Sequence, residues 1–294
     1  MTTDAKSLLP IAQRAVAIAH EIVRTRVPKT ISFKGHRDMV TEVDVAVEHA
    51  VRDFLSQETP DIGFLGEEEG PVIRDGSGLL WALDPIDGTA NFMHGIPLSG
   101  ISLGLIQDDR SILGVIDLPF LDMLYAASEG NGATCNGDAI TTSKADELDA
   151  AIVSVGDYAV GADADHKNRV RIPLNHQLAS RVQRVRMYGS AAIDLAWVAE
   201  GKTDACIMLS NNPWDTAAGV VIAREAGALV TDATGRPPHH AIPRHHRSRP
   251  GRPRPGHRRP RRSRRIALPN CSTPLRLVER RDGTIWHPLD AEEV

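Results

Sequence analysis

Two aspartates stand at the end of an apolar run in the segment Trp81 to Phe92, which reads Trp-Ala-Leu-Asp-Pro-Ile-Asp-Gly-Thr-Ala-Asn-Phe. Residues 79–83 have the length and composition of a buried strand, which we expect to end at Asp84 and Pro85. Carboxylates at a strand end lie where layered α/β proteins bind ligands. Because Pro85 fixes its own φ and disfavours helical geometry before it, the turn that aims Asp84 and Asp87 is rigid. The spacing therefore predicts a preorganised pair of carboxylates that could bind a cation.

The next two residues could bind a phosphate beside that cation. Gly88 lets the backbone approach an anion closely, and Thr89 stands where a helix could begin, with a hydroxyl and free N–H groups. The simpler alternative is an Asp-Pro turn followed by a helix cap, and for an isolated pair of aspartates that alternative is the better one. The other acidic residues of the chain favour the cation.

A glutamate could join this pair from a neighbouring strand. Glu67 lies in an acidic cluster between Gly66 and Gly70, and such clusters are ordinarily solvated loops. Here the cluster follows a short strand expected at 62–65 and precedes the strand that ends at Asp84. It could therefore deliver a carboxylate to the same edge of the sheet.

Two further aspartates fall at expected helix starts. Asp215 begins a helix after Pro213, and Asp44 follows Thr41 at the spacing of a capping box. Capping a helix is the structural alternative for both, and on spacing alone it is the favoured one for Asp44.

The apolar periodicity places these groups on a mixed α/β framework. Gly201 and Gly227 are suited to end two of its helices, and short apolar runs from 101 to 136 predict an antiparallel meander. Helices are expected at 5–26, 41–55, 165–181, 191–200 and 215–226, and strands at 62–65, 79–83, 101–106, 112–118, 124–127, 133–136, 151–155, 182–187, 205–209 and 228–231.

Composition narrows the class of protein. A chain of 294 residues with 41% hydrophobic content can bury a large core. The cysteines, three in number and widely spaced, suggest neither a disulfide framework nor a zinc site, which favours a reducing cytoplasm. No apolar run reaches the ~18 residues of a membrane span, and we see no export signal.

Together the acidic segments resemble the inositol monophosphatase family, of the lithium-sensitive type. The likeness spans roughly residues 5 to 235, and the combination is highly specific although each segment alone is weak. It implies a layered α/β/α/β/α sandwich of the inositol monophosphatase and fructose-1,6-bisphosphatase type. It also implies Mg²⁺-dependent hydrolysis of a small phosphorylated metabolite, and it allows a homodimer. The segments, in the family's order, are Gly66-Glu67-Glu68, Asp84 to Phe92, Trp214 to Gly219 and Glu225 to Gly227, with Lys34 and Asp44 where its upstream elements lie.

The resemblance implies a role for each site residue. The metal ligands would be Glu67, Asp84, Asp87, Asp215 and the backbone carbonyl of Ile86. The catalytic residues would be Thr89, with Asp44 behind it to orient the attacking water, and Glu67. The substrate would be bound by Asp87, Gly88, Thr89, Gly189, Ser190, Ala191 and Asp215.

The residue chemistry agrees with this assignment independently. All the candidate ligands are oxygens, which favours Mg²⁺ over zinc. Two such ions about 4 Å apart can lower the pKa of a bound water and neutralise the leaving oxygen. No protein nucleophile is then required.

The chain departs from the family before Trp214. The family often has an acidic residue there that touches the substrate's hydroxyls, but residues 207–213 supply none. Met208 and its neighbours offer apolar side chains instead, so histidinol phosphate or another monoester stays an alternative to inositol 1-phosphate. We expect modest discrimination among small monoesters.

The second departure is the tail, residues 236–294, which follows the phosphatase-like domain of residues 1–235. From Arg236 to Arg265 it holds twelve arginines and no Asp, Glu or Lys. This composition predicts disorder, and a frameshifted reading of a GC-rich gene is the leading explanation. If the tail is genuine, the alternative is a non-catalytic phosphatase fold that binds nucleic acid through a basic arm, although no aromatic residue supports base stacking.

Overall fold

The computed structural model describes residues 5–26, 28, 31–35, 38–74, 77–161, 163–209, 211–232, 235–238, 240 and 275–278. The helices are α1 (Ala5–Thr25), α2 (Glu42–Glu58), α3 (Thr89–Met93), α4 (Ala164–Ala179), α5 (Ala191–Ala199) and α6 (Pro213–Glu225), with a 3-10 turn at Leu148–Ala150. The strands are β1 (Ile31–Gly35), β2 (Asp38–Thr41), β3 (Gly63–Gly66), β4 (Gly70–Val72), β5 (Leu79–Asp87), β6 (Gly100–Gln107), β7 (Arg110–Leu118), β8 (Met123–Ser128), β9 (Ala133–Cys135), β10 (Asp138–Ala139), β11 (Ile152–Val155), β12 (Arg184–Arg186), β13 (Ala205–Met208), β14 (Val230–Asp232) and β15 (Leu275–Val278).

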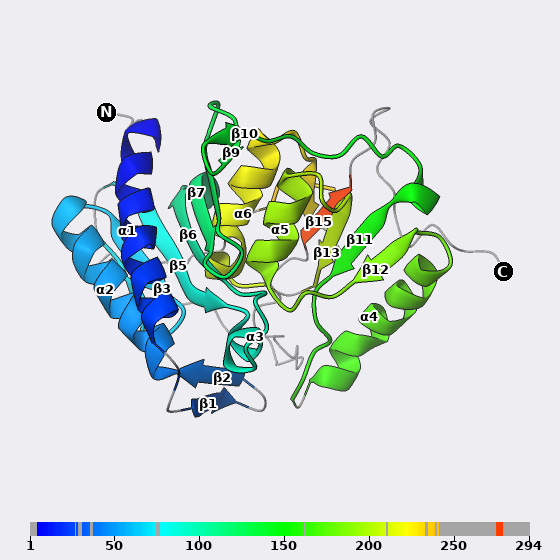
Figure 1. The fold of residues 1–294 in the computed structure, drawn as a ribbon, viewed down its shortest axis with the longest axis horizontal. Coiled ribbons are helices and arrows are strands. Elements are labelled where there is room, and N and C mark those ends of the chain that lie inside the picture. The colour runs from blue at the N-terminus through cyan, green and yellow to red at the C-terminus, as the bar shows by residue number, and fades with distance from the viewer. Residues whose placement is uncertain are drawn as a thin grey trace, which may run out of the picture.

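These elements alternate in layers as helix, sheet, helix, sheet, helix (Figure 1). Helices α1 and α2 cover one face of an eight-stranded sheet with the order β10-β9-β8-β7-β6-β5-β3-β4. Helices α5 and α6 pack between this sheet and a five-stranded one, ordered β12-β11-β13-β15-β14, and α4 covers the far face of the smaller sheet. The predicted α/β/α/β/α sandwich is confirmed.

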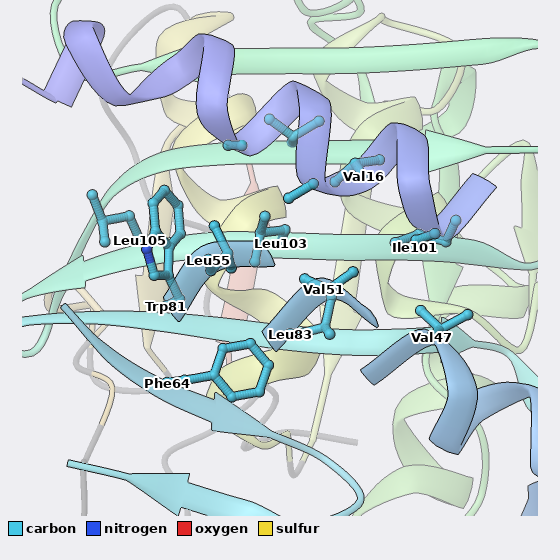
Figure 2. Close-up of a cluster of buried hydrophobic side chains, with 14 of the residues drawn as sticks. Val16, Val47, Val51, Leu55, Phe64, Trp81, Leu83, Ile101, Leu103 and Leu105 are labelled. Carbon is cyan, nitrogen blue, oxygen red and sulfur yellow. The ribbon is translucent and has the colours of Figure 1, made fainter. Parts of the chain in front are cut away.

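The main core lies between the larger sheet and the first two helices. Strand β5 contributes Trp81 and Leu83 to it, and α2 contributes Val47 and Val51 from its three- and four-residue apolar repeat (Figure 2). Helix α1 packs beside α2 in the same way. The described helices, α1 included, lack the combination of length and apolar character that a membrane span requires.

Strand β5 runs past the point where the sequence predicts its end. It pairs with β6 through Asp84, opposite Ser102, and again through Asp87, opposite Gly100, with an irregular register between the two pairs. Pro85 lies in this irregular stretch, where its missing N–H costs no ladder hydrogen bond. The prediction of a strand end at Asp84 is therefore wrong, because a bulge absorbs the proline and pairing resumes.

The other predicted elements are present with small changes in their bounds. Pro173 is accommodated within α4, and the meander from β6 to β9 is antiparallel as expected. The sequence analysis assigned no strand after residue 235, but β15 lies between β13 and β14 and pairs with both. The prediction of disorder for 236–294 otherwise falls mainly on residues outside the described ones.

Candidate active site

Two neighbouring strands bring the first carboxylates together at one edge of the larger sheet. Strands β3 and β5 are parallel, and Gly66 pairs with Leu83. The next residue on each strand is therefore an acid, Glu67 on one and Asp84 on the other. Asp84 is 3% exposed, and its Oδ1 accepts a hydrogen bond from the Ile86 N–H at 3.1 Å.

Asp84 lies in the field of four other acids. Burial raises the pKa of Asp84 well above its ordinary value, and the negative charges of Glu67, Asp87, Asp215 and Asp44 raise it further. Three of these four, Glu67, Asp87 and Asp215, are predicted metal ligands, as is Asp84 itself. The fourth, Asp44, is the predicted partner of the catalytic Thr89. We call the five residues the carboxylate cluster.

Asp87 connects the cluster to α5. Its Oδ2 accepts hydrogen bonds from the Ser190 hydroxyl at 2.8 Å and from the Ala192 N–H. Burial raises the pKa of Asp87 to about 6, although these hydrogen bonds favour its charged form. Ser190 also caps α5, since its Oγ accepts from the Ile193 N–H at 3.2 Å.

The turn after Asp87 has the geometry that the sequence predicts. Gly88 has φ +88°, and a Cβ added there would lie 3.0 Å from the Leu98 carbonyl oxygen, so only glycine fits. Thr89 then begins the short helix α3. Its Oγ1 lies 3.0 Å from the Ile86 carbonyl oxygen and 3.3 Å from Asp44 Oδ1, and its hydrogen can be donated to either.

Asp44 has both of the roles that the sequence left as alternatives. Its Oδ2 accepts from the Thr41 N–H at 2.9 Å, and Thr41 Oγ1 accepts from the Val43 N–H at 3.1 Å, which completes the capping box of α2. Its other oxygen faces Thr89. Burial raises the pKa of Asp44, so the cap holds a group whose charge is costly.

Asp215 likewise caps a helix while it faces the cluster. Its Oδ2 accepts from the Asn212 N–H at 2.6 Å in the capping box of α6. Helix α6 approaches the larger sheet closely because β6 and β7 have glycines beneath it. A Cβ added at Gly104 would lie 2.6 Å from that of Ala217, and one added at Gly114 would lie 2.4 Å from the Ala218 carbonyl oxygen.

A residue that the sequence analysis missed holds the loop that carries Glu67. The side chain of Glu48, on α2, is fully buried, and its two carboxylate oxygens accept from the N–H groups of Glu68 at 2.8 Å and Glu69 at 2.9 Å. His49 and Arg52, also on α2, bind the Glu69 carboxylate. The signal was present, because an acid four residues after Asp44 stands on the apolar face of an amphipathic helix.

Three of the seven predicted substrate residues line a cavity of about 200 Å³ beside the cluster, whereas Asp87, Gly88, Thr89 and Asp215 do not. Gly189, Ser190 and Ala191 form one side of it, and Met208 lines it from β13. Three charged residues that the sequence analysis missed also line this cavity, namely Asp157, Arg171 and Asp194. They come from different elements, so no local spacing signals them.

Asp194 is the buried acid of this cavity. It is 2% exposed, and its Oδ1 has no hydrogen-bond partner among the described residues. Burial raises the pKa of Asp194 to about 7, the charges of Asp87 and Asp157 act in the same direction, and the neighbouring Ser154 hydroxyl opposes them.

A larger cavity of about 250 Å³ lies between α2 and strands β3 to β5, where Leu55, Phe64 and Trp81 are among its lining residues. None of the predicted catalytic, metal or substrate residues lines it. We therefore place the site at the carboxylate cluster and its adjoining cavity.

The cluster suits a cation by its donors rather than by finished coordination geometry. Among the described residues, no three acidic, imidazole or thiol side chains converge as a metal-binding group. Oxygens of Asp44, Asp84, Asp87 and Asp215 instead accept hydrogen bonds from nearby donors. Carboxylates that repel one another are expected to turn toward such donors, and carboxylate oxygens are the ligands that a hard cation prefers.

Comparison with known protein sequences identifies a family. The model of the inositol monophosphatase family matches residues 4–262. The chain is 36% identical over 211 residues to a fructose-1,6-bisphosphatase/inositol-1-monophosphatase of Thermotoga maritima, which covers 72% of this chain and 78% of the relative. It is 37% identical over 205 residues to an inositol-1-monophosphatase of Mesorhizobium japonicum, which covers 70% and 76% respectively.

Solved structures agree with these relatives. The extragenic suppressor protein suhB of Bartonella henselae superposes with a TM-score of 0.73 at 31% identity, over 78% of this chain and 89% of that one. An inositol monophosphatase from Anabaena superposes with a TM-score of 0.70 at 32% identity, over 80% and 87%. The layered fold and the acidic motifs of this chain thus have the same explanation: the chain belongs to the inositol monophosphatase family of phosphatases.

Proposed function

We propose that the protein is a Mg²⁺-dependent phosphomonoesterase that hydrolyses a small phosphorylated alcohol, such as inositol 1-phosphate, with a metal-activated water. The observation that carries this proposal is the placement of the buried Asp84 in the field of four other acids. Such a cluster destabilises the fold unless a cation compensates it. The names of the relatives support a phosphate monoester as substrate.

The donor set fits Mg²⁺. Carboxylates of Glu67, Asp84, Asp87 and Asp215, with the Ile86 carbonyl, would hold the ions, and all of these donors are hard oxygens. Bound there, Mg²⁺ would acidify water and stabilise negative charge on the phosphate and on the leaving oxygen.

The remaining residues position the reactants. Thr89 donates its hydroxyl hydrogen to Ile86 or Asp44, which leaves its oxygen able to accept a hydrogen bond from water. Asp44, whose pKa burial raises, can then receive a proton through Thr89. The N–H groups of Gly88 and Thr89 would receive the phosphate, and the Ser190 hydroxyl donates to Asp87, which connects the cluster to the cavity.

One experiment tests the alternative substrates that the sequence leaves open. The test measures phosphate release from inositol 1-phosphate, histidinol phosphate, glycerol 2-phosphate and fructose 1,6-bisphosphate, with Mg²⁺ and with a chelator. We expect Mg²⁺-dependent release from at least one of them, abolished in Asp84→Asn but not in Asp149→Asn, a matched change at an exposed position. Release that persists in the chelator would overturn the proposal.

The basic-arm alternative has a separate readout. Tight, salt-sensitive binding of nucleic acid, together with no phosphate release from any of these esters, would favour a non-catalytic role for residues 236–294.

A further inference from the structure

One side of the cavity beside the cluster is acidic although the segment expected to supply an acid has none. On β13 and just after it, Met208, Leu209 and Asn211 line the cavity without a carboxylate. Asp157 lines it from the loop that follows β11. The two segments are far apart in sequence, but β11 and β13 are paired parallel neighbours in the smaller sheet.

The loop that carries Asp157 is anchored at both ends. Before it, the Gly156 N–H donates to the Ile207 carbonyl at 2.9 Å. After it, Ala159 exchanges two hydrogen bonds with the Asn168 side chain of α4, at 2.8 and 3.0 Å. Asp157 is thus held between β13 and α4.

The Asp157 carboxylate lies close to the predicted substrate residues. Gly189 has φ +72°, and a Cβ added there would lie 3.6 Å from Asp157 Oδ2. The charge of Asp157 also reaches the buried Asp194, whose pKa it helps to raise. Asp157 is exposed, and no hydrogen bond or ion pair engages its carboxylate among the described residues. Both of its oxygens can therefore accept hydrogen bonds from a ligand.

The rest of the cavity presents donors. Arg171 is buried, and one arm of its guanidinium donates to the Leu209 carbonyl. Asn211 adds an amide, whereas the Ser190 hydroxyl, which also lines the cavity, already donates to Asp87. An ammonium group on the substrate would meet the Arg171 cation, and a carboxylate would meet Asp157 and Asp194. A neutral hydroxyl suits both kinds of neighbour, because it donates and accepts.

We propose that Asp157 determines specificity by accepting a hydrogen bond from a hydroxyl of the substrate's alcohol part. It thereby supplies, from the loop after a neighbouring strand of the sheet, the acid that residues 207–213 lack. The inference rests on the proposed phosphomonoesterase function and names its substrate class, a phosphorylated polyol. It also revises the expectation of modest discrimination, which assumed an apolar surface around Met208.

The test compares a polyol ester with an ester that offers no hydroxyl. In the parent, Asp157→Asn and Asp157→Ala, kcat and KM are measured for inositol 1-phosphate and for p-nitrophenyl phosphate at saturating Mg²⁺. We expect KM for inositol 1-phosphate to rise about 10- to 100-fold in both variants, the scale of one hydrogen bond to a charged group. Values for p-nitrophenyl phosphate and the Mg²⁺ requirement should not change.

Asp165→Asn is the matched control, because it removes a negative charge from the exposed first turn of α4. Analogues of inositol 1-phosphate that each lack one hydroxyl sharpen the test. For the analogue without the contacting hydroxyl, parent and Asp157→Ala should have the same kcat/KM.

The outcomes separate this inference from the proposed function. If the parent does not hydrolyse inositol 1-phosphate with Mg²⁺, the role of Asp157 is overturned, and the proposed function fails as well only if no ester of the panel releases phosphate. If the parent hydrolyses both, but the variants lose nothing or lose both activities equally, only the role of Asp157 is overturned.

Discussion

The carboxylate cluster and the cavity beside it are assembled in different ways. The acids of the cluster lie in the last four residues of β5, just beyond the end of β3, or in the first turns of α2 and α6, and a short motif marks each of them. The charged residues of the cavity come from a loop, from the middle of α4 and from α5, and no motif marks them. Local sequence therefore specifies the end of the site where we propose the reaction, while tertiary packing specifies the end that we propose recognises the alcohol.

The two regions also balance charge differently. The acids around Asp84 raise its pKa together, so the cluster is neutralised by protons or, as we propose, by cations. The cavity combines Asp157 and Asp194 with Arg171, and hydroxyl groups can satisfy such a mixture. Variants should accordingly separate loss of metal-dependent chemistry from loss of substrate choice.

The largest effect is expected from neutralising one cluster acid. Asp84→Asn, Asp87→Asn or Asp215→Asn should each abolish Mg²⁺-dependent phosphate release while leaving the fold intact, because each removes a ligand charge. Without Mg²⁺ the melting temperature should hold or rise, since repulsion is relieved. Turnover within about tenfold of the parent for all three variants would remove the basis of the site assignment.

Thr89→Ala should lower kcat by about 10²-fold, the usual scale for groups that orient water or transfer protons. The Mg²⁺ concentration for half-maximal activity should change little, because the hydroxyl carries no ligand charge. Titrating Mg²⁺ against activity in both proteins measures the two quantities separately. Normal kcat with weakened Mg²⁺ activation would contradict this role.

Glu48→Gln tests whether the helix that backs the cluster matters for the metal. An amide offers one acceptor where the Glu48 carboxylate offers two, so the N–H groups of Glu68 and Glu69 cannot both be satisfied as they are now. We expect Mg²⁺ affinity to fall about 10- to 100-fold, as for other residues that orient ligands. Glu58→Gln, on the same helix but partly exposed, is the control and should bind Mg²⁺ normally.

The smallest effect concerns stability in the cavity. The folded-state pKa of Asp194, about 7, lies above its unfolded value of about 3.9, so the parent loses stability as pH rises between these values. Asp194→Asn should raise the melting temperature relative to the parent by several degrees at about pH 7 or above, and by nothing near pH 4. Asp149→Asn should show no such pH dependence.

Repeating these melting-temperature measurements with Mg²⁺ separates the effects of the carboxylate cluster from those of the cavity. Mg²⁺ should oppose the pH-dependent loss of stability that comes from the cluster acids. The Asp194 difference should lose only the part that is due to the charge of Asp87, because Asp194 is not a predicted ligand. A gain in Asp194→Asn that disappears with Mg²⁺ would mean that this aspartate belongs to the metal site.

Much of this architecture was predictable from sequence because its determinants are local. Apolar repeats predicted α1 and α2, and the spacing of Thr41 and Asp44 predicted a capping box that the structure contains. The sequence treated capping and a place in the cluster as alternatives for Asp44 and Asp215. The structure combines them, because a carboxylate has two oxygens and a cap needs only one.

The parts that sequence could not predict depend on contacts between distant segments. The continuation of β5 through Pro85 depends on β6, which resumes pairing at Gly100. Asp157 reaches the cavity because β11 lies beside β13. Strand β15 is only four residues long, which is too short for its sequence alone to predict it. Strand pairing of this kind depends on residues that are far apart in sequence, so no short segment of the chain predicts it.

The close contact of α6 with the larger sheet has a consequence for the width of the reaction centre. Gly104 and Gly114 lie under Ala217 and Ala218, two and three residues along from Asp215. Because these glycines have no side chain, α6 lies directly against the backbone of the sheet. This close contact sets the distance between Asp215 and the acids of β5. A methyl group at Gly114 would push α6 away from the sheet. Asp215 would move with the helix, and the space for a cation would widen although no ligand residue is changed.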